Sequence, residues 1–211
     1  ACTDDMAVIA AQAGALAIEI DSYAPRGISR MNALTTICTG ARFRGRERAG
    51  DLYAAINWVR RQPWADQNRI VAAGWSHGSW AIMDALALES GDEMRRATGL
   101  IDLPPEPLEG LSGTLLVYPY MGAASLAGRR NWRIAPRSIA ILAGRDQVVG
   151  VRVPRLAVER QRARGAPIEV VMFPNATHAF EDGLAEDPRI RFDPELVARE
   201  HALLCDLIGS C

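Results

Sequence analysis

The sequence predicts an α/β fold in which a mostly parallel central sheet carries helices on both faces. Short apolar segments of strand length alternate with longer segments whose apolar residues recur at helical spacing, and this alternation is typical of parallel sheets. Several strand-like segments also end in polar residues suited to chemistry, as strands of open parallel sheets often do. No repeat or interdomain linker interrupts the pattern, so residues 1–211 are expected to form a single domain.

The expected strands are Ala15 to Ile20, Ile70 to Gly74, Thr114 to Tyr118, Ile139 to Ala143 and Ile168 to Phe173. The expected helices are Ala7 to Ala13, Gly50 to Arg61, Ser79 to Leu88, Val153 to Arg164 and Pro194 to Ile208. Within the second of these helices, Leu52, Ile56 and Val59 share one face, as in a helix that packs against a sheet. Residues 21–50 and 121–137 are rich in glycine, proline and arginine, and we expect them to form the rim of a pocket.

Gly74-Trp75-Ser76-His77-Gly78 forms a G-x-S-x-G motif between an apolar strand and an apolar helix. This context predicts a nucleophile elbow, in which the serine occupies a strained turn that raises its hydroxyl above the sheet. The glycines on either side are expected to remove Cβ atoms that would clash as the chain reverses. The N-terminus of the following helix directs partial positive charge toward an oxyanion, and the backbone N–H of His77 is expected to bind it.

A serine nucleophile needs a base, and the chain has three histidines. His77 would point into the start of the helix and His201 lies within a helical pattern, which leaves His178. His178 follows the last expected strand, and Asp146 follows the strand before it, so both are expected at carboxyl ends of strands. Asp146 would hold the imidazole in the required tautomer.

Each of these residues also has a purely structural interpretation. An aspartate after a strand is often a turn former or a helix cap, and a lone Ser–His pair is commonly structural. Asp102 or another acid could also supply the carboxylate, although Asp102 opens a proline-rich stretch before the strand that leads to Asp146. The chain order serine, aspartate, histidine is that of the α/β hydrolases and differs from the chymotrypsin and subtilisin orders. The sequence therefore predicts Ser76, Asp146 and His178 as a catalytic triad.

Four segments together carry a resemblance to a known family. They are Asp21-Ser22-Tyr23-Ala24-Pro25-Arg26-Gly27, Asp66-Gln67-Asn68-Arg69-Ile70, Gly144-Arg145-Asp146, and Phe173-Pro174-Asn175-Ala176-Thr177-His178-Ala179-Phe180. In this combination the chain resembles the dienelactone hydrolase family over nearly its whole length. The resemblance implies an α/β-hydrolase fold, hydrolysis of an ester or lactone, and no metal or other cofactor.

Some features depart from the pattern of this family. The founding enzymes use a cysteine nucleophile, whereas Ser76 resembles the serine-bearing relatives, and Ser79 stands where many relatives have a second glycine. In relatives a strand ends in a His-Gly-Cys-type loop, and by this resemblance the backbone N–H of Cys2 completes the oxyanion site. The sequence starts at Ala1 without the strands that precede this loop in relatives, so we expect those N-terminal strands to be missing from it.

Two sets of arginines could bind an anion. Arg26 lies in the first resemblance segment at the end of an expected strand, and it is the candidate for binding a substrate carboxylate, although arginine in such loops often pins backbone carbonyls. The alternating residues Arg42, Arg44, Arg46 and Arg48 are instead expected to form a solvated loop.

Composition narrows the possible partners. A net charge of −1 gives no reason to expect nucleic acid or an anionic membrane, and no segment is long and apolar enough to span a bilayer. The family resemblance implies a small-molecule ester or lactone as the partner. The histidines and cysteines lack the close pair spacings of a metal site. Four cysteines permit disulfides without requiring them, so the compartment stays open: an exported or periplasmic protein fits them, and a cytoplasmic one remains the alternative.

The sequence thus predicts a serine hydrolase that cleaves a carboxylic ester or lactone through an acyl-enzyme intermediate. Two alternatives remain open. The catalytic domain of a prolyl-oligopeptidase-like serine peptidase shares the elbow and the residue order, and an upstream β-propeller would favour it. A non-catalytic binding protein of the α/β-hydrolase fold is disfavoured because all three triad positions are occupied.

Overall fold

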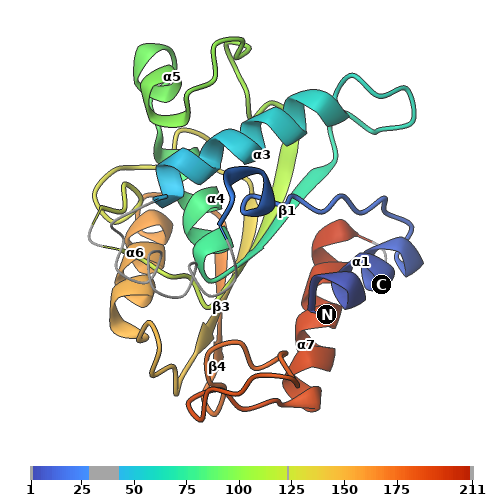
Figure 1. The fold of residues 1–211 in the computed structure, drawn as a ribbon, viewed down its shortest axis with the longest axis vertical. Coiled ribbons are helices and arrows are strands. Elements are labelled where there is room, and N and C mark those ends of the chain that lie inside the picture. The colour runs from blue at the N-terminus through green and yellow to red at the C-terminus, as the bar shows by residue number, and fades with distance from the viewer. Residues whose placement is uncertain (1, 29–42, 123, 210–211) are drawn as a thin grey trace.

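In a computed structural model of the chain, residues 2–28, 43–122 and 124–209 are described. Within these ranges one sheet contains four parallel strands in the order β1-β2-β3-β4 (Figure 1). The strands are β1 (Ile70–Trp75), β2 (Leu111–Val117), β3 (Arg137–Ala143) and β4 (Ile168–Phe173). Trp75 pairs with Val117, and Val117 pairs with Ile141, so the carboxyl ends of β1, β2 and β3 meet at one edge of the sheet.

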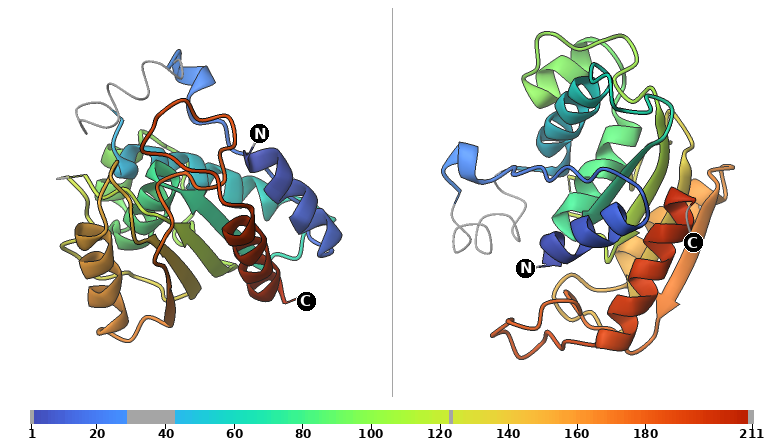
Figure 2. Two further views of the ribbon diagram at one scale, coloured as in Figure 1. Left: turned by 90° about the horizontal axis from the view of Figure 1, so that it is seen from below. Right: turned by 90° about the vertical axis from the view of Figure 1, so that its right-hand side faces the viewer.

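Helices cover both faces of this sheet (Figures 1 and 2). On one face lie α3 (Gly45–Val59), α4 (His77–Ala87) and α6 (Arg152–Arg162), and on the other lie α1 (Cys2–Gln12) and α7 (Pro194–Ile208). Successive strand residues alternate between the two cores: Leu116 packs beneath α3 and α4, whereas Leu115 packs beneath α7. The short helix α5 (Asp92–Thr98) contacts α3, and η1 (Ala24–Arg26) is a single 3-10 turn.

Most predicted elements are present, several with shifted ends. β4 and α7 have the predicted bounds, and Asp193 caps α7 by accepting hydrogen bonds from two backbone N–H groups of its first turn. α3 begins at Gly45 rather than at Gly50. The backbone N–H of Arg44 donates to Glu47 Oε2 at 2.6 Å, which satisfies a donor at the helix start. A Cβ on Gly45 would meet the Trp80 indole, so glycine permits α3 to lie close to α4.

The predicted strand Ala15 to Ile20 is wrong. These residues are assigned to no strand, and β1, the outer strand on one side of the described sheet, pairs only with β2. The prediction rested on an apolar segment of strand length, but Leu16, Ile18 and Ile20 are 67%, 41% and 39% exposed. A strand forms only where a neighbouring strand takes up its backbone hydrogen bonds, and the sequence pattern says nothing about that neighbour.

The N-terminal helix is longer than expected, and one helix was not predicted. α1 begins at Cys2 rather than at Ala7, and α5 follows α4 after a short turn. Of the two stretches expected to form a pocket rim, residues 29–42 and 123 lie outside the described residues. Among the helices of the described ranges, none has the length and apolar character needed to cross a bilayer.

Candidate active site

Ser76 lies in the turn between β1 and α4, with φ 48° and ψ −111°, a strained conformation for a residue with a side chain. A Cβ on Gly74 would lie 2.7 Å from the carbonyl carbon of Gly78, so the turn needs glycine at that position. Gly78 differs from the expectation, because the nearest atom to a Cβ there is Arg48 Nη1 at 3.7 Å, an ordinary contact. The turn therefore has the geometry of a nucleophile elbow, and Gly74 is the glycine that its sterics require.

Ser79, in α4, stabilises this turn through its hydroxyl. Its hydroxyl lies 2.5 Å from the carbonyl oxygen of Gly74 and 3.1 Å from that of Val117. The backbone N–H of Ser76 also donates to Val117 O at 2.9 Å, so the end of β2 holds the elbow at two points. A glycine at position 79, as in many members of the family that the sequence resembles, could not form the side-chain bonds.

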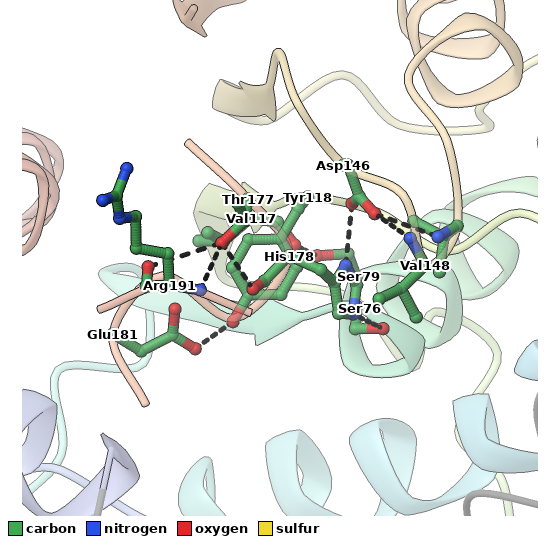
Figure 3. A network of polar contacts seen from close by, with 11 residues as sticks. Ser76, Ser79, Val117, Tyr118, Asp146, Val148, Thr177, His178, Glu181 and Arg191 are labelled. Atoms are coloured by element: carbon green, nitrogen blue, oxygen red, sulfur yellow. Dashed lines mark hydrogen bonds and ion pairs between the residues drawn. The ribbon is translucent and has the colours of Figure 1, made fainter. Parts of the chain in front are cut away.

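The structure brings Ser76, His178 and Asp146 together in one line (Figure 3). His178 Nε2 lies 3.0 Å from Ser76 Oγ, and His178 Nδ1 lies 2.7 Å from Asp146 Oδ2. The carboxylate can only accept, so Nδ1 carries the proton, and the lone pair of Nε2 is then directed at the serine hydroxyl. This is the tautomer that a general base next to a serine nucleophile needs.

The second oxygen of Asp146 is also occupied. Oδ1 accepts hydrogen bonds from the backbone N–H groups of Val148 and Val149, both at 2.9 Å. The carboxylate lies in the turn after β3 and is buried, so these bonds fix its orientation and leave Oδ2 for the imidazole. Asp102 is exposed, and the carboxylate at His178 Nδ1 belongs to Asp146.

Two residues beside His178 were not singled out from the sequence. Tyr118 follows β2 at the same sheet edge and its ring lies 4.6 Å from the imidazole, centroid to centroid. Its hydroxyl donates to Glu181, which follows His178 in the chain (Figure 3). The available signal was the position of Tyr118 at the end of an expected strand, where parallel sheets carry their chemistry.

The two predicted oxyanion donors lie in different helices. His77 is the first residue of α4, so its backbone N–H has no acceptor in a preceding helical turn and is available beside Ser76. The backbone of Cys2 begins α1, a helix that packs against α7, rather than the loop implied by the family resemblance. A role for Cys2 therefore stays a prediction.

The side chain of His77 is held on the side of α3. Its Nδ1 lies 3.2 Å from Arg48 Nη1, and its Nε2 lies 3.0 Å from the carbonyl oxygen of Phe43. Burial, and then the positive charge of Arg48, lowers the pKa of His77 to about 4, so this imidazole is neutral at neutral pH. Arg48, expected in a solvated loop, lies instead within α3 and directly behind the elbow.

Arg26 occupies a structural position in this conformation. Its Nη1 and Nη2 bind Asp51 Oδ2 and Oδ1 at 2.9 and 2.7 Å, and Nη1 also donates to Ser22 O at 2.7 Å. The guanidinium additionally lies over the Phe43 ring. These contacts of Arg26 are thus within the protein, and its substrate role stays a prediction.

No group of three or more histidine, cysteine, aspartate or glutamate side chains suited to a metal ion occurs within residues 2–28, 43–122 and 124–209. The arrangement at Ser76 is instead that of a hydroxyl with a neighbouring base and a fixed carboxylate. Such a set can perform nucleophilic acyl transfer without a metal.

No protein-family model matches the sequence, and a comparison with curated proteins finds no match. Solved structures do match. Thermogutta terrifontis esterase 2 phosphonylated by cyclosarin superposes with a TM-score of 0.59 at 18% identity, over 78% of this chain and 65% of that one. The butyrate-bound form of this thermophilic esterase, Est2, gives a TM-score of 0.58 at 18% identity, over 81% of this chain and 68% of that one.

A third structure, the same esterase phosphoramylated by tabun, gives a TM-score of 0.59 at 19% identity over 81% of this chain. The chain spans a little under two thirds of the length of the first of these structures. At this level of identity the likeness concerns the fold, and it does not single out the dienelactone hydrolase family. Together with the parallel sheet and its two helical layers, it shows that this chain has the α/β-hydrolase fold.

Proposed function

We propose that this chain is a serine hydrolase that cleaves a carboxylic ester or lactone, as the family that its sequence resembles does. The observation that carries the proposal is the hydrogen-bonded line from Asp146 through His178 to Ser76. The fold supports it, since the matching structures are of an esterase, in forms phosphonylated by cyclosarin and phosphorylated by paraoxon.

In the proposed reaction, Ser76 Oγ attacks the carbonyl carbon of the substrate while His178 Nε2 takes the hydroxyl proton. Asp146 stabilises the imidazolium that forms, through the bond to Nδ1. His178 then gives the proton to the departing alcohol oxygen, and an acyl-enzyme remains on Ser76. Water attacks this ester with His178 again acting as base, which releases the acid and restores the serine.

The negative charge on the carbonyl oxygen develops beside the N-terminus of α4. The backbone N–H of His77 is the proposed donor to it, and the helix dipole acts in the same direction. The proposed acyl group is short, because the matching esterase is also described with butyrate and with propionate bound.

The proposal is tested by measuring hydrolysis of nitrophenyl butyrate and of a small lactone. Ser76→Ala should lower kcat by up to about a million-fold, as for the nucleophile of a comparable triad. Ser90→Ala, at an exposed position between α4 and α5, serves as the matched control and should behave as the unchanged protein. A fluorophosphonate probe should add its mass to the peptide that contains Ser76, and to no peptide of the Ser76→Ala variant.

The alternatives give different results in the same assays. Cleavage of aminoacyl nitroanilides in preference to nitrophenyl esters would favour a peptidase. If the probe does not label Ser76 and no ester is hydrolysed, the chain is a binding protein and the proposal is wrong.

A further inference from the structure

The side chain of His77 has a set of partners that the proposed reaction does not use. The residue is 5% exposed. Tyr23, Phe43 and Arg48 contact its ring from two segments that precede the elbow in the chain. These contacts join the residue that follows Ser76 to the beginning of α3. They are therefore placed to set the position of the elbow.

The chemistry of the partners allows only one form of the ring. A guanidinium can only donate, so His77 Nδ1, 3.2 Å from Arg48 Nη1, must present its lone pair. A backbone carbonyl can only accept, so His77 Nε2, 3.0 Å from Phe43 O, must carry the proton. The neutral Nε2–H tautomer satisfies both contacts, whereas an imidazolium would place two donors against each other.

Arg48 is itself fixed by uncharged partners. Its Nε donates to Ser22 Oγ at 3.0 Å, and its Nη1 donates to Tyr23 Oη at 3.1 Å. The guanidinium also lies over the Tyr23 ring, 5.0 Å from the centroid. The guanidinium of Arg48 thus joins the segment before η1 to the elbow through Ser22 Oγ, Tyr23 Oη and His77 Nδ1. A lysine ammonium lacks the planar set of donors that reaches all three acceptors.

We infer that Arg48 is a positioning residue for the oxyanion site, which acts by holding His77 as the neutral Nε2–H tautomer and thereby fixes the backbone N–H of His77 beside Ser76. The inference rests on the proposed function, because that N–H matters only if an oxyanion forms. The ring is joined to the backbone through Cα, and its contacts hold that atom in place at the strained start of α4. Release of the ring would therefore allow Cα and the adjacent N–H to shift.

Loss of the Arg48 contact should change kcat rather than KM. An oxyanion donor acts mainly in the transition state, and loss of one such donor lowers kcat by about 100- to 1,000-fold. Displacement of the donor is a smaller change than its loss. Arg48→Met should therefore lower kcat by about 10- to 100-fold and leave KM within about three-fold.

The decisive experiment is a double-mutant cycle on nitrophenyl butyrate with Arg48→Met, His77→Ala and the double variant. If Arg48 acts through His77, the double variant has the kcat of the slower single variant. Arg155→Met, in an exposed ion pair on α6, is the matched control and should leave kcat unchanged. Losses that multiply in the double variant, or an unchanged kcat in Arg48→Met, overturn the inference.

A second measurement uses the unchanged protein and does not depend on catalysis or on the folding of any variant. A long-range ¹H–¹⁵N NMR spectrum reports which ring nitrogen of His77 carries the proton. Protonation at Nε2 with a bare Nδ1 is expected, and protonation at Nδ1 overturns the inference. An unchanged protein that hydrolyses no ester but shows the Nε2–H form would refute the proposed function while leaving the contact of Arg48 with His77 established.

Discussion

The ring of Tyr118 lies against the imidazole of His178, with centroids 4.6 Å apart and an interplanar angle of 58°. Tyr118 is held there in an unfavourable backbone conformation, φ 33°, and its N–H donates to Ile141 O at 2.8 Å. Backbone strain of this kind persists only where the surroundings enforce it. The tyrosine ring therefore packs against the imidazole of His178 and limits its rotation.

We expect the Tyr118 ring to matter more for catalysis than its hydroxyl. Tyr118→Ala removes the ring that packs against His178. It should lower kcat for nitrophenyl butyrate about ten-fold, because the imidazole loses alignment with Ser76 Oγ. Tyr118→Phe retains the ring and removes the hydroxyl that donates to Glu181, so kcat should fall by no more than about three-fold. Equal losses in the two variants would assign the effect to the hydroxyl instead.

Asp84 on α4 is a second buried carboxylate, with a structural role. It accepts hydrogen bonds from the backbone N–H groups of Leu126 and Ala127 at 2.8 and 3.1 Å and from Trp80 Nε1 at 2.8 Å. Asp84→Ala leaves these buried donors without an acceptor, so the free energy of unfolding should fall by about 3 kcal/mol. Urea denaturation checks this value. Asp92→Ala, an exposed carboxylate on α5, should change it far less.

The elements that could be predicted are those whose structure depends on the sequence of their own segment. β4 and α7 were predicted with their bounds, because each is a continuous apolar pattern within its own segment. Ser76, Asp146 and His178 could be expected to meet, since the carboxyl ends of neighbouring parallel strands lie at one edge. The predicted strand at residues 15–20 failed, because strand pairing depends on a distant segment.

The contacts of Arg48 were not predictable for a similar reason. Arg48 belongs to an alternating run of arginines that has the pattern of a solvated loop. It contacts His77 because α3 begins early and packs closely on α4, which depends on the absence of a side chain at Gly45. Such a contact between two helices has no signature in either segment alone.

Glu200 on α7 should make stability depend on pH. Trp75 Nε1 donates to Glu200 Oε1 at 2.6 Å, and burial, followed by the neighbouring charge of Glu181, raises the pKa of Glu200 from 4.5 to about 8. Between these two values the folded state holds a proton that the unfolded chain has released. The contribution of Glu200 to stability is therefore complete below about pH 4.5 and is lost as the pH rises to about 8.

Glu200→Gln keeps an acceptor for Trp75 and removes the ionisation. We expect the free energy of unfolding of this variant to exceed that of the unchanged protein by at least about 1 kcal/mol at pH 8, with the difference shrinking toward pH 5. Urea denaturation at several pH values gives the comparison. Glu169→Gln, an exposed carboxyl on β4, is the control. A Glu200→Gln variant that is less stable than the unchanged protein at pH 8 would contradict the assigned direction.

Asp146→Asn should change which ring nitrogen of His178 carries the proton. The backbone N–H groups of Val148 and Val149 both need an acceptor, so the amide oxygen of the asparagine should face them. The amide nitrogen then faces His178 Nδ1 and can only donate to it, which forces the proton onto Nε2, the atom that must accept from Ser76.

We therefore expect Asp146→Asn to keep its fold and to lose about a thousand-fold or more in kcat, because the imidazole is held in the tautomer that cannot act as base. Far-ultraviolet circular dichroism tests whether the fold is kept, and the nitrophenyl butyrate assay measures kcat. Asp102→Asn replaces an exposed carboxylate and should leave kcat unchanged. If Asp102→Asn were the inactive variant and Asp146→Asn the active one, the role of Asp146 in orienting His178 would have to be abandoned, since of these two acids only Asp146 contacts His178 in the structure.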